Sequence, residues 1–182
     1  NDTGSITVYK DGRPFLIDIG VESYTKKTFS PQRYEIWTMQ SAWHNLPTFD
    51  GVQQLPGAEY AAREVCTDKN SITGELAGAY PPIPGLTTYR RSVSVREQGI
   101  TLRDETDHPG TVELTLLTEQ QPVPAADGFV VGTLGGIRFD PDAVTAAVAP
   151  VSITDPRLRT AWPETIYKIT LHFQKMLDLE LY

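Results

Sequence analysis

The strongest constraint on the fold is an alternation of apolar and polar side chains with a period of two. It is clearest in the segments Tyr89–Arg96, Thr111–Leu117 and Thr165–Phe173. Successive side chains of a β-strand point to opposite faces of its sheet, so this alternation is typical of strands with one buried face. The period of 3.6 residues that indicates helices is much rarer in this chain.

Shorter segments of the same character occur along the rest of the chain and end at Gly or Pro, of which there are fourteen each. These segments are 5–9, 14–18, 59–65, 72–76, 100–104, 128–131, 136–139 and 144–148. Short strands at spacings of about 8–12 residues, with turns between them, are typical of a β-sandwich. We therefore expect an all-β fold, an antiparallel β-sandwich of roughly ten or more short strands, in a single domain over residues 1–182.

The sequence also indicates several connections between strands. Asp11-Gly12 is a hairpin turn signal, and the Gly-rich segment 132–136 is expected to be another hairpin turn. The proline-bearing stretches 77–88 and 119–127 are expected to be exposed loops. Residues 32–43 fit either a helical turn or an irregular strand.

Composition excludes several classes of protein. The 182 residues include 16 Lys and Arg against 23 Asp and Glu, a net charge of −7, which argues against binding nucleic acid or anionic membranes through a general basic surface. A local basic cleft for an acidic ligand remains possible. A single cysteine, Cys66, excludes an intrachain disulfide and a Cys-rich metal site. The chain contains no run of about 18 apolar residues, the length that would predict a membrane span.

Two residues are unusual in their local context. Asp18 lies in the apolar run Leu16–Gly20, where it either ends a strand and caps a turn at Gly20 or binds a cation. His44, between Trp43 and Asn45, is either a partly buried histidine held by one backbone bond or a metal ligand.

The remaining candidates for chemistry are weaker. His108, in a turn, is expected to be solvated, and His172 to be a surface or half-buried strand residue, so this chain alone offers too few ligands for a complete zinc site. Arg90-Arg91 and the pair Arg157 and Arg159 are expected to lie on solvated faces. The chain has no nucleophile elbow, phosphate loop, dinucleotide fingerprint or His-Glu-x-x-His helix.

Several of these residues carry a family resemblance. The main segments are Leu16–Gly20 with Tyr24, Arg33-Tyr34, His44-Asn45 and Asp50–Gln54, with weaker support from 76–80, 89–91 and 102–104. Together they resemble the C-terminal, supersandwich-like β-domain of heparinase II/III-like proteins, which are polysaccharide lyases that cleave uronate-containing polymers.

The resemblance implies a larger protein and a metal. An α/α-toroid domain would precede this chain, which would then be a fragment, and Asp2 would match the Asp of the family's linking His-x-His…Asp motif. Asp18 and His44 would be two ligands of a structural zinc ion whose third ligand, a histidine, lies upstream of Asn1. Zinc binding by the chain alone would then be weak or absent.

The resemblance also implies a reaction, the β-elimination of a uronate. Tyr34 would be the catalytic tyrosine of this domain, with Tyr24 as the alternative. The non-catalytic interpretation is that Tyr34 is an ordinary packed aromatic residue. Arg33 and Tyr24 would contact an acidic polysaccharide, with Lys26 and Lys27 as further basic residues nearby. The isolated domain would be inactive, and the whole protein periplasmic or secreted in a bacterium.

A second hypothesis needs no catalysis. The same fold could be a carbohydrate-binding or scaffold domain that stacks sugars on Trp37, Trp43 and Trp162. A third, purely structural interpretation is that the unusual residues only hold loops together.

Overall fold

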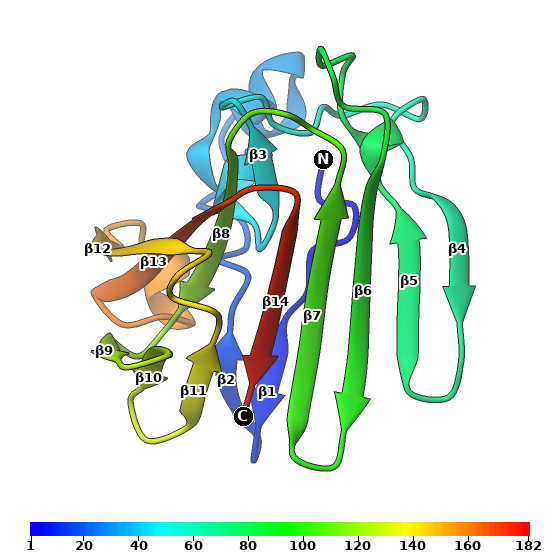
Figure 1. Ribbon diagram of the computed structural model, residues 1–182. Helices are drawn as coiled ribbons and strands as arrows, with labels where there is room; N and C mark the ends of the chain where they lie inside the picture. Colours follow the sequence, from blue (N-terminus) through cyan, green and yellow to red (C-terminus); the bar gives the residue numbers. More distant parts are fainter.

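The fold consists of β-strands joined by turns. The computed structural model describes residues 1–182, with fourteen strands, six short 3-10 turns and no α-helix. Every strand pair is antiparallel. The predicted all-β antiparallel sandwich is therefore confirmed (Figure 1). No helix in the structure has the length and apolar character needed to cross a membrane.

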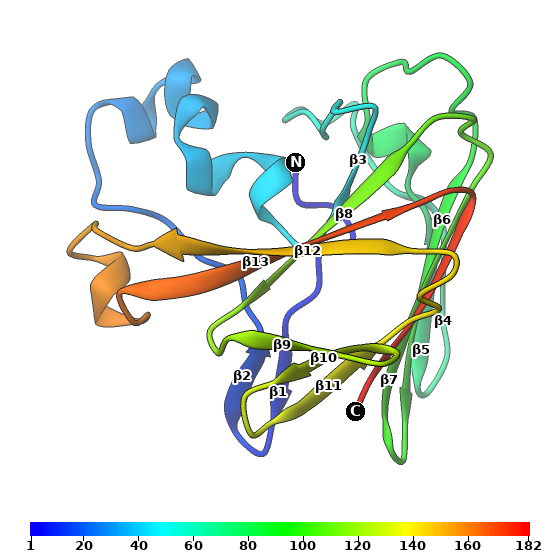
Figure 2. The same ribbon diagram turned by 60° about the vertical axis from the view of Figure 1, so that its left-hand side comes forward.

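The larger sheet has eight strands, and Figure 2 shows its β9–β11 end turned away from the plane of β4–β7. In the order of the sheet they are β4 Arg63–Thr67, β5 Ser71–Glu75, β6 Tyr89–Arg96, β7 Gly99–Thr106, β14 Met176–Leu181, β11 Gly135–Arg138, β10 Gly128–Val131 and β9 Pro122–Ala125.

The smaller sheets complete the sandwich. The four-stranded sheet has the order β12 Thr145–Ser152, β13 Thr165–Phe173, β8 Val112–Thr118 and β3 Pro47–Phe49. The strands β1 Val8–Lys10 and β2 Arg13–Leu16 form a hairpin. Its turn residues Asp11 and Gly12 have φ of 52° and 73°, the left-handed conformation that an Asp-Gly turn adopts readily.

The main core lies between the sheets. One face of β8, β13 and β14 supplies apolar side chains to a cluster of 25 buried residues, and for β8 and β13 the period-two pattern predicts this. A second, smaller core lies on the far side of β8 and β13. Its buried members are Ile17, Ile19, Leu117, Ile153, Leu158 and Ile166.

Consecutive 3-10 turns cover this second core and settle the structure of residues 32–43. They are η1 Lys27–Phe29, η2 Pro31–Glu35, η3 Trp37–Met39 and η4 Ser41–Trp43, and Figure 2 shows them grouped at the end of the molecule that carries the N-terminus. The segment is therefore a series of helical turns rather than an irregular strand.

Three strands differ from the sequence expectations. Residues 122–125 form β9, whereas a loop was expected over 119–127. Pro122 and Pro124 are tolerated there because β9 is the last strand of its sheet and needs partners on one side only. Strand β14, which alternates Leu177, Leu179 and Leu181 with polar residues, and the three-residue β3 were not expected.

Candidate functional site

The 3-10 turns and the N-terminal segment border a cleft of about 380 Å³. Its lining includes Asp18, Arg33, Tyr34 and His44, which come from three separate segments. The other lining residues are Asn1, Asp2, Gly20, Val21, Thr38 and Met39. The structure thus brings together every predicted site residue except Tyr24.

Asp18 and His44 form a direct pair in this cleft. The carboxylate oxygen Oδ2 of Asp18 lies 2.7 Å from Nδ1 of His44, and Oδ1 accepts a hydrogen bond of 2.8 Å from the N–H of Gly20. Asp18 therefore caps the Gly20 turn, as the first interpretation predicts, and also pairs with His44; cation binding stays a prediction. Burial raises the pKa of Asp18, but the hydrogen bond and charge of His44 outweigh it, and the pKa is lowered overall.

Asn45 fixes the backbone that carries His44. Its side-chain amide is fully buried, donates to the carbonyl groups of Ile6 and Ile17, and accepts from the N–H of Leu117. These three backbone groups lie in the N-terminal segment, at the end of β2 and in β8. Asn45 therefore ties the two sides of the cleft to the sandwich.

A buried ion pair supports Asn45 from the large sheet. Arg91 makes two hydrogen bonds of 2.8 Å and 2.7 Å to the carboxylate of Asp104. The same guanidinium donates to the carbonyl groups of Asn45 and Gly4. The expectation of a solvated Arg90-Arg91 pair is wrong for Arg91, because the N-terminal segment crosses this part of the sheet and covers its side chain.

Arg33 and Tyr34 lie together on η2. Ser30 accepts a hydrogen bond from the N–H of Gln32, and Pro31 occupies the first position of the turn, so the start of η2 is well defined. The guanidinium of Arg33 lies 5.4 Å from the centre of the Tyr34 ring. Arg33 makes no ion pair, and its positive charge is therefore available to an acidic ligand in the cleft.

Tyr24 lies outside the cleft. Its ring is 56% exposed, contacts the ring of Phe29 edge-on, and has the guanidinium of Arg157 over its face. The structure therefore places Tyr24 on a neighbouring surface and leaves Tyr34 as the tyrosine of the cleft.

The three tryptophans have mainly a packing role. Trp37, Trp43 and Trp162 are all partly buried against the second core. The indole N–H of Trp37 donates to Glu22 and that of Trp162 to the carbonyl of Ile19. Packing against the second core therefore leaves only part of each tryptophan ring exposed for the sugar stacking that the carbohydrate-binding hypothesis requires.

The ligands of a zinc site are incomplete in this chain. Structural zinc is bound by four ligands in a tetrahedral arrangement. Asp18 and His44 supply two donors, and no group of three or more His, Cys, Asp or Glu side chains converges anywhere in the structure. The residues present therefore do not fit a zinc ion by themselves.

His108 differs from its expected solvated position. It is 1% exposed, and its Nε2 lies 3.0 Å from the carboxylate of Asp50. Its ring also packs edge-on against Phe49. The turn that bears His108 folds back onto β3, a contact between distant segments that the local pattern Asp107–Gly110 does not reveal.

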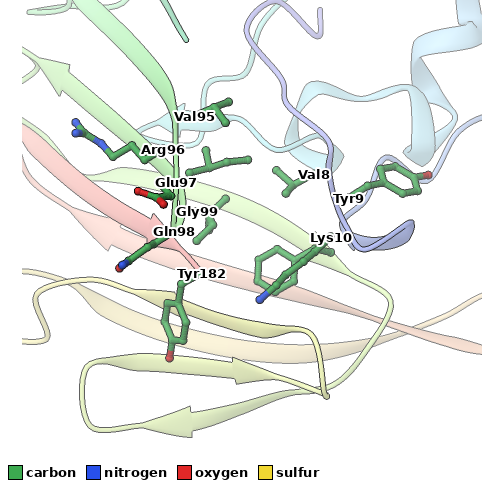
Figure 3. A pocket seen from close by; sticks show the side chains of 12 residues that line it. Val8, Tyr9, Lys10, Val95, Arg96, Glu97, Gln98, Gly99 and Tyr182 are labelled. Atoms are coloured by element: carbon green, nitrogen blue, oxygen red, sulfur yellow. The ribbon is translucent and has the colours of Figure 1, made fainter.

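A second cavity, of about 430 Å³, lies at the opposite end of the sandwich, near the C-terminus (Figure 3). Val8 and Val95 border it, Lys10 and Tyr182 lie at its margin, and the side chain of Arg96 extends away from it. It contains none of the predicted site residues.

Comparisons with known proteins find similarity at the level of structure. No protein-family model matches the sequence, and no curated protein matches it. A heparinase III, the BT4657 gene product with methylated lysines, superimposes with a TM-score of 0.69 at 15% identity, over 98% of this chain and 29% of that protein. The heparan sulfate lyase HepC from Pedobacter heparinus superimposes with a TM-score of 0.63 at 16% identity, over 98% of this chain and 30% of that protein.

At these identities the similarity concerns the fold. It covers nearly all of this chain but less than a third of either lyase, and it supports the sandwich domain that the resemblance implied. The chain has the fold of one domain of heparinase III and of heparan sulfate lyase.

Proposed function

We propose that this chain is the β-sandwich domain of a polysaccharide lyase that cleaves uronate-containing polysaccharides by β-elimination. The observation that carries the proposal is the cleft that Arg33 and Tyr34 line together with the Asp18–His44 pair. The shared fold with two lyases supports it. Because this chain spans about 30% of those proteins, we expect the remaining catalytic groups to lie on another domain.

Arg33 and Tyr34 have complementary roles in this proposal. In β-elimination, the C5 proton of a uronate moves to a base, a C4–C5 double bond forms, the C4–O4 bond breaks and O4 takes up a proton. Arg33 pairs with the uronate carboxylate and stabilises the negative charge that develops when the C5 proton leaves. The hydroxyl group of Tyr34 donates the proton to O4. The base comes from the other domain.

The Asp18–His44 pair has a structural role in this proposal. The pair joins the end of β2 to the turn after η4, and so holds two walls of the cleft together. A zinc ion would need two further ligands, one of which we propose to be a histidine before Asn1 in a longer protein and the other a water molecule. Asn1 lies in the same cleft, so a residue joined to it is within reach of the pair.

The elimination assay tests the catalytic proposal. The unsaturated uronate product absorbs in the near ultraviolet, and this absorbance should rise with the longer protein and stay constant with this chain alone. In the longer protein, Tyr34→Phe should lower kcat by about 10²–10⁴-fold, the range typical of a lost general acid. Tyr9→Phe, at the opposite end of the molecule, is the matched control and should retain full activity. Full activity of the Tyr34→Phe variant would contradict the proposed acid.

Zinc titration tests the metal proposal separately. This chain alone should bind zinc weakly, and a chain extended by the upstream residues should bind it orders of magnitude more tightly. His44→Ala in the extended chain should remove the gain, whereas His172→Ala should not. Equal zinc affinity of the short and extended chains would contradict the proposed third ligand.

A further inference from the structure

Two aromatic rings and one arginine form an exposed group, here called the aromatic–arginine patch: Tyr24, Phe29 and Arg157. Phe29 is 78% exposed, and its ring centre lies 5.4 Å from that of Tyr24. The guanidinium carbon of Arg157 lies 4.1 Å from the centre of the Tyr24 ring. Tyr24 and Phe29 belong to the segment between Val21 and Arg33, and these two residues both line the cleft.

Hydrogen bonds and two buried side chains hold the backbone beneath the patch. The carboxylate of Asp155 accepts hydrogen bonds from the N–H groups of Ser23, Arg157 and Leu158, at 3.0–3.1 Å. Leu158 is buried in the second core, so this carboxylate connects the two loops of the patch to the interior of the molecule. Thr28, also buried, accepts a hydrogen bond from the N–H of Thr25. The exposed rings therefore lie on a fixed backbone.

The charge of Arg157 is not neutralised by the protein. A second arginine, Arg138, packs on a tyrosine ring in a similar way, 4.6 Å above Tyr182. Arg138 is paired with the carboxylates of Asp127 and Glu180, at 2.6 Å and 2.9 Å. Arg157 has no such ion pair, although the chain carries a net charge of −7. Its guanidinium can therefore pair with an external anion without breaking an internal ion pair.

We propose that the aromatic–arginine patch is a second sugar subsite, which binds an acidic unit of the same polysaccharide that occupies the cleft. The apolar face of a pyranose ring packs on the exposed ring of Phe29. The carboxylate or sulfate of that unit pairs with Arg157, whose planar guanidinium suits two parallel hydrogen bonds. The inference rests on the proposed function for the identity of the polysaccharide, while the patch itself rests on its own geometry.

Binding measurements on this chain test the subsite. Isothermal titration with size-defined heparan sulfate oligosaccharides should give heat of binding, and dextran oligosaccharides of equal length should give none. Arg157→Gln should weaken binding about tenfold or more, through the lost charge-assisted hydrogen bonds. Phe29→Ala should weaken it about fivefold, through the lost stacking. Arg138→Gln changes the net charge equally and should leave the affinity unchanged.

Four outcomes would overturn the subsite: equal weakening by Arg157→Gln and Arg138→Gln, unchanged affinity in both patch variants, equal binding of dextran, or no binding of the acidic oligosaccharides. The unfolding temperature of each variant should match that of the parent chain, since the side chains of Phe29, Arg138 and Arg157 are all exposed.

The subsite and the proposed function can fail independently. If Arg33→Gln abolishes oligosaccharide binding while the patch variants bind normally, the subsite is wrong and the cleft remains the binding site. If the longer protein shows no elimination but binding still depends on Arg157 and Phe29, the proposed reaction is wrong and the patch remains a site for acidic sugars.

Discussion

Asn45→Ala removes a single side-chain amide but should strongly lower the free energy of unfolding. The Asn45 side chain is fully buried and makes three hydrogen bonds, of 2.7, 3.0 and 2.8 Å, to backbone groups of Ile6, Ile17 and Leu117. Alanine removes all three bonds and leaves two carbonyl groups and one N–H without partners in the interior.

The magnitude follows from the cost of unpaired buried groups. Each costs about 1–3 kcal/mol, so three of them should lower the free energy of unfolding by about 3–9 kcal/mol. A typical domain has only about 5–15 kcal/mol of stability. We therefore expect Asn45→Ala to be marginally folded at room temperature. Asn45→Asp should be equally or more damaging, because it keeps the size of the side chain but places a carboxylate against two carbonyl groups.

Urea unfolding followed by tryptophan fluorescence measures this effect. The matched control is Asn70→Ala, since the side chain of Asn70 is exposed and makes no hydrogen bond, and its unfolding free energy should change by less than about 0.5 kcal/mol. A similar small loss for Asn45→Ala would refute the reasoning, because it would mean that the three backbone groups find other partners.

Three further predictions concern stability. Arg91→Met should cost about 3–5 kcal/mol in urea unfolding by leaving the Asp104 carboxylate buried without its partner, and combining it with Asp104→Leu should recover much of the loss. Hydrogen bonds from the 87–88 loop outweigh desolvation and lower the pKa of Asp107 to about 2, so its stabilising effect is complete above about pH 4 and disappears as the pH falls toward 2. The difference in unfolding free energy between the parent chain and Asp107→Asn should therefore stay below about 1 kcal/mol at pH 7, since the side chain is exposed, and vanish near pH 2; a constant difference would contradict this origin. Gly128→Ala should lower the free energy of unfolding by more than about 2 kcal/mol, since φ is 144° and the new Cβ would lie 2.0 Å from a carbonyl oxygen of β11. Gly12→Ala, where φ is also positive but no atom lies near the new Cβ, should lower it by only about 1 kcal/mol. Equal losses for the two variants would contradict the steric argument.

The strands were predictable from sequence because alternation is a local property. The segments Tyr89–Arg96 and Thr165–Phe173 form strands with the predicted bounds, since one buried face requires an apolar residue at every second position. Pro122–Ala125 was not predictable in this way. A proline-bearing segment becomes a strand only if it lies at the edge of a sheet, and the order of strands in a sheet is a property of the whole fold.

The candidate site also has features that the local sequence shows and features that depend on the packing of distant segments. Asp18 and His44 already stand out in the amino-acid sequence, because a carboxylate in an apolar run and a histidine beside a tryptophan are local features. The packing of distant segments places the two side chains 2.7 Å apart, brings Tyr34 into their cleft and leaves Tyr24 outside it. The same packing buries Arg91 and His108, since segments far apart in sequence cover them. Burial and proximity of this kind depend on how distant segments pack, which the local sequence pattern does not encode.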